Sequence, residues 1–304
     1  MTQLPITVVI PVKNEAKNLS ECLAWLEGFT EVVVVDSAST DRTAEIAKAA
    51  GATVLDFHWT GGFPKKRNWI LQTFAFKTPW VLFVDADERL TPAFKTAVAE
   101  AVTKADYVGF WLCYRNHFMG RVLHHGIPQR KLALFRVGAG YFERIDDPGW
   151  STLDMEVHEH PILDGLVGYI AEPIEHDDFR GLHHFISRHN EYSSWEAHRY
   201  LALINDPMVW NHLKRRQKLK YRALRHWWYA PAYFMTSYFW KRGFLDGSVG
   251  FMYAVIKFAY QFEIRAKILE AELGAPRTRP DPQAACSSSS IGCATTAKLP
   301  PLKR

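Results

Sequence analysis

The stretch Val81-Leu82-Phe83-Val84-Asp85-Ala86-Asp87 decides how we interpret the other residues of this chain. Four apolar residues of strand-forming type lead directly into two aspartates that are separated by one alanine. A continuous apolar run is typical of a strand buried on both faces, as in a parallel sheet covered by helices. Because side chains of an extended chain alternate with period two, Asp85 and Asp87 can point the same way. Two carboxylates at the end of a strand suit Mg²⁺ or Mn²⁺.

A second interpretation of the same residues is a strand followed by a turn, with Asp87 or Thr91 capping a helix that starts at Pro92. The surrounding sequence favours a ligand site, because apolar strand patterns alternate with amphipathic helix patterns. The predicted strands are Ile6–Val12, Glu31–Val35, Thr53–Phe57 and Trp80–Val84, and the predicted helices are Asn18–Leu26, Asp41–Ala50 and Lys65–Phe76. This alternation predicts right-handed crossovers and a parallel sheet, whose ligands bind at the carboxyl ends of the strands.

The loop after the first predicted strand disfavours two common kinds of nucleotide site. Pro11–Glu15 contains no glycine, whereas a dinucleotide fingerprint and a P-loop both need glycines there. Phosphatases of the haloacid-dehalogenase type place an Asp-x-Asp after their first strand, and here the pair follows the fourth. A mononucleotide whose phosphates are held through a metal ion remains.

The composition is that of a globular protein, with 48% hydrophobic residues and a net charge of +5 that decides little by itself. The four cysteines show no disulfide or zinc-type spacing. The first residues lack the basic segment of a signal peptide, so a cytosolic location is expected.

Four segments resemble, in order and at fitting spacing, the motifs of family 2 glycosyltransferases with the GT-A fold. They are Ile6–Glu15, Val32–Arg42, Gly61–Asn68 and Val84–Glu88. The resemblance implies a nucleotide-sugar donor and a divalent cofactor, Mg²⁺ or Mn²⁺. The donor residues that it implies are Pro11, Glu15, Asp36, Arg67, Asn68 and Asp85. Lys66 stands where the family often has alanine, and it adds positive charge where the phosphates should lie. It makes Asp87 the principal metal ligand, places Asp85 on the ribose or the metal, and adds His176 as a third contact to the metal or the diphosphate.

Transfer with inversion needs a carboxylate that takes the proton of the acceptor hydroxyl. In family 2 this base follows the metal motif, and Asp154–His160 is rich in acids and histidines. Val157-His158-Glu159 resembles a motif of the branch that builds lipopolysaccharide cores. We expect Glu159 to be the base, with Glu156 second and Asp154 third. If this segment is a strand, Glu156 and Glu159 face opposite ways, so at most one of them serves.

The C-terminal third changes to helix, with predicted helices at Leu182–Ile204 and Met208–Tyr229. Lys214–His226 has no acid and precedes a dense aromatic band. This combination predicts binding to an anionic membrane surface, at about 1 kcal/mol per basic residue. The residues assigned to it are Lys214, Arg215, Arg216, Trp227, Trp228, Phe234, Tyr238 and Trp240. The aromatics form one apolar block instead of spaced stacking platforms, which disfavours nucleic acid. The apolar runs are too short to span a bilayer.

We therefore expect an α/β GT-A fold, Rossmann-like, with a mainly parallel sheet covered by helices on both faces, plus a C-terminal α-helical membrane-associating region. The expected parts are 1–178, divided near 105, then 179–273, then a disordered tail 274–304 that is rich in Pro, Ser and Thr. Residues Gly243–Gly250 would form the turn between two interfacial helices.

The expected activity is inverting, metal-dependent hexose transfer, with glucose from UDP-glucose as the guess, to a lipid-linked or lipopolysaccharide-core saccharide. The expected place is the cytoplasmic face of a bacterial inner membrane, with peripheral or monotopic attachment. Two alternatives are a nucleotidyltransferase, whose usual Gly-rich first loop is missing here, and a catalytically silent membrane-binding module.

Overall fold

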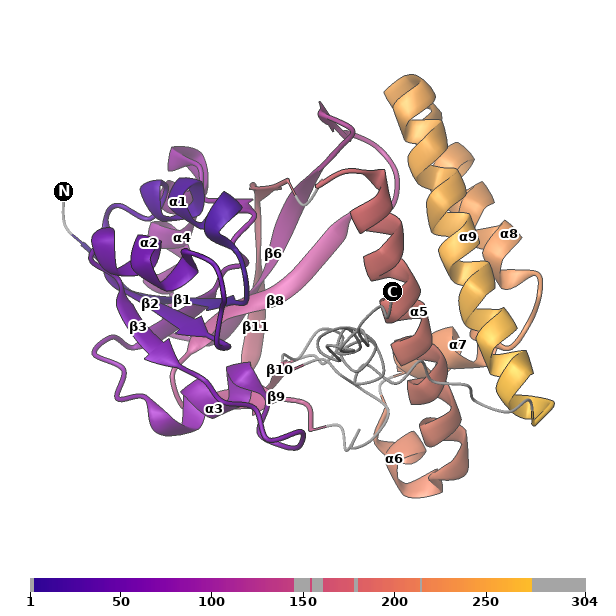
Figure 1. Cartoon of the computed structure of the whole chain (residues 1–304), viewed down its shortest axis with the longest axis horizontal. Coiled ribbons are helices and arrows are strands. Elements are labelled where there is room, and N and C mark those ends of the chain that lie inside the picture. The colour runs from indigo at the N-terminus through magenta and orange to yellow at the C-terminus, as the bar shows by residue number, and fades with distance from the viewer. Residues whose placement is uncertain (1–2, 145–153, 155–160, 178–179, 214, 275–304) are drawn as a thin grey trace, which may run out of the picture. The chain divides into compact units, whose positions relative to one another are not determined.

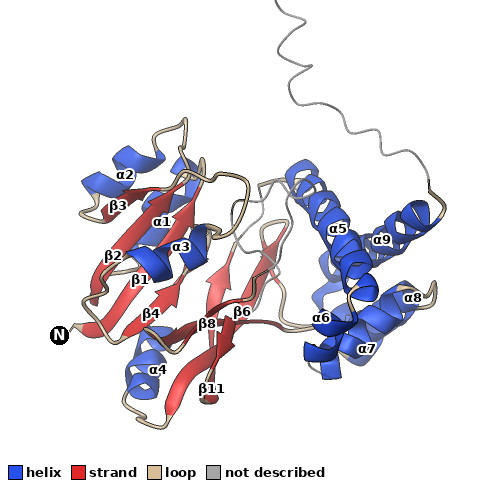
Figure 2. Ribbon diagram, turned by 90° about the horizontal axis from the view of Figure 1, so that it is seen from below, coloured by secondary structure: helices blue, strands red, loops and turns tan. Residues whose placement is uncertain are grey.

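The computed structural model describes residues 3–144, 154, 161–177, 180–213 and 215–274, without the side chains of Met208 and His212. Its first part alternates strands and helices: β1 (Leu4–Val12), α1 (Ala16–Ala24), β2 (Phe29–Asp36), α2 (Thr43–Ala49), β3 (Thr53–Asp56), α3 (Lys66–Thr73) and β4 (Trp80–Phe83). These strands lie in the order β3-β2-β1-β4 and every neighbouring pair is parallel, so the predicted parallel sheet is confirmed here. Since the chain crosses back over β1 after β3, right-handed crossovers place α3 on the opposite face from α1 and α2 (Figures 1 and 2).

The other part of the sheet is mixed, so the prediction of a mainly parallel sheet is wrong for it. The further elements are β5 (Glu88–Arg89), α4 (Pro92–Val102), β6 (Tyr107–Phe118), β7 (Arg121–Val122), β8 (Gln129–Arg136) and β11 (Leu166–His176). β8 is antiparallel to both β4 and β6, because the chain returns from β6 through the short strand β7. β11 then pairs parallel with β6, and β5 pairs antiparallel with β11. A separate antiparallel pair is formed by β9 (Gly140–Phe142) and β10 (Pro161–Leu163).

The core lies around β1 and β4. All four residues of β4 are buried, as predicted for a strand covered on both faces. The ring of Phe83 stacks on Phe135 of β8 with 5.8 Å between centroids, so the first half of the sheet packs directly against the second. The second interpretation of the aspartate stretch also holds in part. The hydroxyl of Thr91 caps α4 by accepting a 3.2 Å hydrogen bond from the N–H of Phe94, and Pro92 begins the helix.

The C-terminal region is helical: α5 (Leu182–Asn205), α6 (Pro207–His212), α7 (Arg215–Leu224), α8 (Tyr229–Phe234), the π-helix η1 (Met235–Trp240), the 3-10 helix η2 (Gly243–Asp246) and α9 (Gly247–Glu272). The single helix expected for Met208–Tyr229 is wrong, since α6 ends at His212 and the buried Leu213 lies in the break. Residues of α5, α7 and α9 share one hydrophobic cluster that includes Tyr200, Leu224 and Ile264. In the part of the chain that the structure describes, no helix has both the length and the apolar character needed to cross a membrane.

Two glycines let the last helices approach closely. A Cβ on Gly250 would lie 2.2 Å from the carbonyl oxygen of Gly243, which shows how tightly α9 packs on η2. The carboxylate of Asp246 accepts hydrogen bonds from the backbone N–H groups of His124 (3.2 Å) and His125 (2.9 Å). The helical region is thus attached to the loop between β7 and β8. The expected turn Gly243–Gly250 is η2 and the first turn of α9. Met1–Ile268 form one compact unit, and Leu269–Arg304 a second.

Candidate active site

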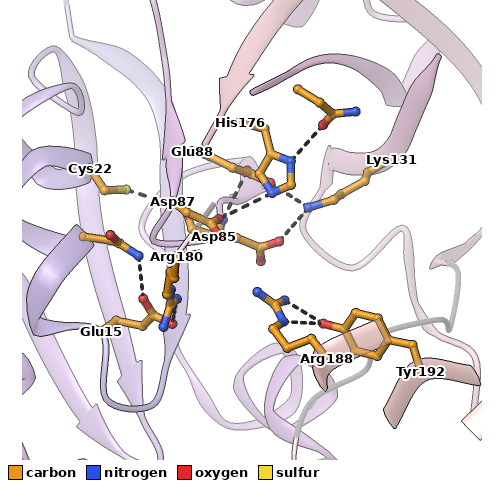
Figure 3. A network of polar contacts seen from close by, with 12 residues as sticks. Glu15, Cys22, Asp85, Asp87, Glu88, Lys131, His176, Arg180, Arg188 and Tyr192 are labelled. Atoms are coloured by element: carbon orange, nitrogen blue, oxygen red, sulfur yellow. Dashed lines mark hydrogen bonds and ion pairs between the residues drawn. The ribbon is translucent and has the colours of Figure 1, made fainter. Parts of the chain in front are cut away.

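Asp87 and His176 meet at the carboxyl edge of the sheet (Figure 3). Asp87 lies in the turn after β4, and His176 ends β11, which is held there because the N–H of Asp177 donates to the carbonyl of Asp87 at 3.0 Å. Nε2 of His176 is 3.6 Å from Oδ1 of Asp87. On the other side of the ring, Nδ1 lies 2.9 Å from Oδ1 of Asn116, an acceptor, so Nδ1 carries the proton and Nε2 has a free lone pair.

This pair suits a divalent cation. Oδ1 of Asp87 is buried and has no hydrogen-bond partner among the described residues, which is a costly state for a carboxylate oxygen unless a cation completes it. Burial lowers the pKa of His176, although the charge of Asp87 opposes the shift, so the neutral, ligating form of the ring is favoured. Carboxylate oxygen suits both Mg²⁺ and Mn²⁺, and imidazole nitrogen is a ligand of transition-metal ions. No cluster of three or more metal-binding side chains occurs in the described part of the chain.

Asp85, in contrast, has both carboxylate oxygens bound to cations. Arg67 donates to Oδ1 at 3.0 Å and Lys131 donates to Oδ2 at 2.6 Å. Burial acts to raise the pKa of Asp85, but the charges of Lys131 and Arg67 outweigh it and hold that pKa well below its ordinary value. The strand ends at Phe83 and the chain turns at Ala86 and Asp87, so the period-two alternation does not extend to the two aspartates. Asp85 and Asp87 therefore contact different side chains: Asp85 binds Arg67 and Lys131, and Asp87 lies beside His176.

Lys131 also binds Glu88, with 2.6 Å between its Nζ and Oε1 of Glu88. Glu88 is 1% exposed, and burial raises its pKa to about 8 although Lys131 acts to lower it. The other oxygen of Glu88 accepts the backbone N–H of Asp85 at 3.1 Å. Neither Glu88 nor Lys131 was among the residues predicted for the site.

The loops after β1 and β2 border the same edge. Asn14 has a positive φ of 56°, a conformation that asparagine tolerates well and that takes the place of the missing glycine. Its side-chain oxygen accepts the N–H of Thr40 at 2.8 Å, which ties the two loops together. Asp36 is buried and accepts hydrogen bonds from the N–H of Ser39 at 3.3 Å. Pro11 is buried in β1.

Glu15 forms an ion pair with Arg180, which lies just before α5. Further along α5, Nη2 of Arg188 donates to the hydroxyl of Tyr192 at 2.6 Å, and Figure 3 shows Arg180 and Arg188 on the same side of the aspartates. Both arginines and Lys131 were missed, because no local pattern in the sequence places β8 or α5 beside β4.

Two predicted donor residues have structural partners. Lys66 is 2% exposed and donates to the carbonyl of Val12 at 2.8 Å. Burial lowers its pKa, and the nearby carboxylates of Asp154 and Asp36 oppose that shift. The amide of Asn68 exchanges two hydrogen bonds with the backbone of Phe142, at 3.0 and 2.9 Å, and so anchors β9. Their contact with the donor stays a prediction.

Of the three candidate bases, only Asp154 is described. Oδ2 of Asp154 lies 3.6 Å from Nζ of Lys66, and its carbonyl accepts the N–H of Lys66 at 3.0 Å. This places Asp154 at the start of α3. Glu156 and Glu159 lie outside the described residues, as does Lys214 of the basic segment.

Comparison with known proteins assigns the class. Residues 7–154 match the family described as Glycosyl transferase family 2. The lipopolysaccharide core biosynthesis glycosyltransferase LpsC of Rhizobium meliloti (strain 1021) is 28% identical over 283 residues, which cover 88% of this chain and 93% of LpsC. An uncharacterized glycosyltransferase of Rickettsia bellii is 24% identical over 90% of both chains. Among solved structures, S. aureus TarS 1–349 in complex with UDP-GlcNAc aligns with 90% of this chain and 92% of that chain, at 16% identity and a TM-score of 0.45.

The fold is therefore a GT-A-like α/β fold with a mixed sheet. Residues 7–154 are thus similar to glycosyltransferase family 2, and most of the chain resembles known glycosyltransferases.

Proposed function

We propose that this protein transfers a hexose, with inversion, from a nucleotide-sugar donor to a lipid-linked or lipopolysaccharide-core saccharide, and that UDP-glucose is the donor. The carboxylate oxygen of Asp87 that lies beside His176 without a hydrogen-bond partner among the described residues is the observation that carries the proposal. The similarity to LpsC over most of both chains supports the acceptor class. The UDP-GlcNAc in the TarS complex is a property of that protein.

Each group at the edge has a role in this proposal. Asp87 and His176 would hold Mg²⁺ or Mn²⁺, which supplies positive charge against the departing diphosphate. Arg67 lies at the same edge, fixed by Asp85 and by the faces of Phe83 and Phe142 at 5.9 and 5.3 Å, and adds a permanent positive charge. Positive charge that is already oriented costs no reorganisation when the leaving group becomes negative.

The acceptor hydroxyl must lose its proton to a carboxylate. Glu159 is our first choice and Glu156 the second. Asp154 is the third, and its carboxylate lies 3.6 Å from the ammonium of Lys66. Glu159→Gln should abolish transfer and keep donor binding. Normal transfer by that variant would move the role to Glu156 or Asp154.

A membrane-facing surface is the second element of the proposal. The exposed aromatic side chains of η1, η2 and α9 are Phe239, Trp240, Phe244, Phe251 and Phe262. Two less exposed rings pack against some of these side chains. Phe234 contacts Phe239 and Phe251, and Tyr238 contacts Phe244. Phe234 and Tyr238 are thus half-buried packing residues.

Exposed basic residues occur in the same helical region. Lys241 and Arg242 are exposed directly after η1, and Arg215 and Arg216 are exposed at the start of α7. Lys220 is partly neutralised, since it lies 2.7 Å from Glu196 of α5. Apolar aromatics beside basic residues favour the headgroup region of an anionic bilayer. We therefore place the enzyme at the cytoplasmic face of the inner membrane, attached from one side.

A donor screen tests the function directly. Purified full-length protein with Mn²⁺ and anionic vesicles would be incubated with UDP-glucose, UDP-GlcNAc, GDP-mannose or a nucleoside triphosphate, and the released nucleotide measured. Release of UDP from one UDP-hexose supports the proposal. Pyrophosphate release from a triphosphate would favour a nucleotidyltransferase, and binding of no nucleotide would favour a silent membrane-binding module.

A further inference from the structure

The position of Lys131 follows from the antiparallel register of β4 and β8. Leu82 pairs with Leu134 and Val81 with Phe135. Extending this register by three residues beyond Leu82 brings Lys131 opposite Asp85. The side chain of Lys131 thus reaches the first aspartate from the neighbouring strand, just beyond the end of β4, where the sheet carries the predicted donor site.

Lys131 connects β8 to the turn that carries both aspartates. Its ammonium donates to Oδ2 of Asp85 and to Oε1 of Glu88, each at 2.6 Å, and lies 4.7 Å from the centroid of the Tyr114 ring. The turn closes on itself, because the N–H of Glu88 donates to the carbonyl of Asp85 at 3.0 Å and the N–H of Asp85 donates to Glu88 at 3.1 Å. The hydrogen bonds from Arg67 to Oδ1 and from Lys131 to Oδ2 hold the carboxylate of Asp85 in one orientation.

As a consequence, the two aspartates differ in whether their carboxylate oxygens are available to a cation. With Arg67 on Oδ1 and Lys131 on Oδ2, neither oxygen of Asp85 is free to turn toward the cation site. Oδ1 of Asp87 faces His176 and accepts no hydrogen bond from any residue that the structure describes. Without Lys131, Oδ2 of Asp85 would lose its cation and could join Asp87 as an additional ligand.

We propose that Lys131 is a positioning residue that holds Asp85 away from the cation, so that Asp87 and His176 ligate it and Asp85 stays oriented toward the donor. This inference rests on the proposed function, since it assigns a role within the same site. It differs from a purely structural role, in which Lys131 only donates a hydrogen bond to the buried Glu88.

Two variants separate these roles. Lys131→Met leaves the buried Oε1 of Glu88 without its hydrogen-bond donor and should lower the melting temperature. The double variant Lys131→Met/Glu88→Gln also removes the carboxylate, so its melting temperature should return toward that of the wild type. In both variants Oδ2 of Asp85 loses its cation, while Arg67 still binds Oδ1. Lys131→Arg keeps a cation in place and should recover part of the turnover.

The readouts are the melting temperature, kcat and KM for the donor, and the affinity for Mn²⁺ measured from the electron paramagnetic resonance signal of free Mn²⁺. For the folded double variant we expect kcat to fall about 10-fold or more. We expect Mn²⁺ to bind about 10-fold more tightly, because Asp85 adds a second carboxylate ligand. General damage to the site would weaken both. A double variant with unchanged kcat and unchanged Mn²⁺ affinity, or with weakened Mn²⁺ binding, would overturn the proposal.

The Mn²⁺ titration without nucleotide keeps this test separate from the proposed function. If the wild-type protein uses no nucleotide sugar, the proposed function fails. Tighter Mn²⁺ binding by the double variant would still support the proposal that Lys131 restrains Asp85. Unchanged or weaker binding would contradict that proposal.

Discussion

His176 directs the lone pair of its Nε2 toward Oδ1 of Asp87 at 3.6 Å, and the hydrogen bond of its Nδ1 with Asn116 holds the ring in that orientation. The two residues belong to distant parts of the chain, and the pairing of β11 with β5 brings them together. A carboxylate oxygen and an imidazole nitrogen, both suited to a divalent cation, converge here at the edge of the sheet. This arrangement is the basis of the metal-dependent mechanism proposed above.

The close approach of η2 and α9 predicts a large effect of a small substitution. Gly250→Ala would place a Cβ 2.2 Å from the backbone carbonyl of Gly243, and a backbone atom cannot move aside cheaply. We expect a loss of about 1–3 kcal/mol in the free energy of unfolding, measured by urea denaturation. Gly62→Ala is the matched control, because a Cβ at that position would meet no atom of the described residues within 4 Å. Equal stability of the two variants would contradict this packing.

Lys257 predicts a dependence of stability on pH. Burial lowers its pKa from 10.5 to about 8, and its Nζ is 3.2 Å from Nε2 of His189. Below pH 8 the lysine is charged in both states, so the folded state carries the full cost of the buried charge. Between about 8 and 10.5 only the folded protein loses this proton, and its relative stability rises.

Lys257→Met should therefore raise the melting temperature at pH 7, by the equivalent of about 1–2 kcal/mol, and the gain should shrink as the pH rises toward 10.5. The measurement is a series of thermal unfolding curves between pH 7 and 10.5. Lys48→Met, at an exposed position of α2, is the control and should show little change at any pH. A destabilised Lys257→Met variant at pH 7 would contradict the prediction.

The aromatic surface predicts a loss of vesicle binding. Trp240 and Trp227 have 82% and 73% of their surface exposed, and burial of each ring in the headgroup region should contribute about 1.5–3 kcal/mol. Trp227→Ser/Trp240→Ser should lower partitioning onto anionic vesicles by about 10-fold or more in a sedimentation assay, with solution turnover retained. Tyr141→Ser, at an exposed aromatic residue of β9, should not affect partitioning. Undiminished vesicle binding of the double variant would exclude this surface.

The first half of the sheet could be predicted because its signals are local. Apolar runs such as Val81–Val84 indicate strands, and amphipathic patterns between them indicate helices. Since a helix that connects two strands of one sheet forms a right-handed crossover, these strands are expected to be parallel. The boundaries moved by a few residues, as when α3 ended at Thr73 instead of Phe76. The mixed half was missed, because the pairing of β8 with β4 depends on contacts that no short pattern encodes.

The same reason explains which site residues were missed. Asp85, Asp87 and Arg67 lie in recognisable motifs, whereas Lys131 becomes visible only once the register of β4 and β8 is known. His176 was proposed from the resemblance, and the structure supplies its physical reason, since β11 ends beside the turn that carries Asp87. The two aspartates were expected to act as a pair, and the end of β4 at Phe83 separates their partners.

The decisive test of the metal site is a calorimetric titration of Mn²⁺ into the full-length protein with UDP present, for the wild type and for Asp87→Asn. Asp164→Asn, at an exposed position in the turn before β11, serves as the control. We expect saturable binding of Mn²⁺ to the wild type and the control, and at least about a 10-fold weaker affinity for Asp87→Asn, together with the loss of sugar transfer. Equal Mn²⁺ affinity of Asp87→Asn and the wild type, or full transfer in the presence of a chelator, would contradict the metal-dependent mechanism.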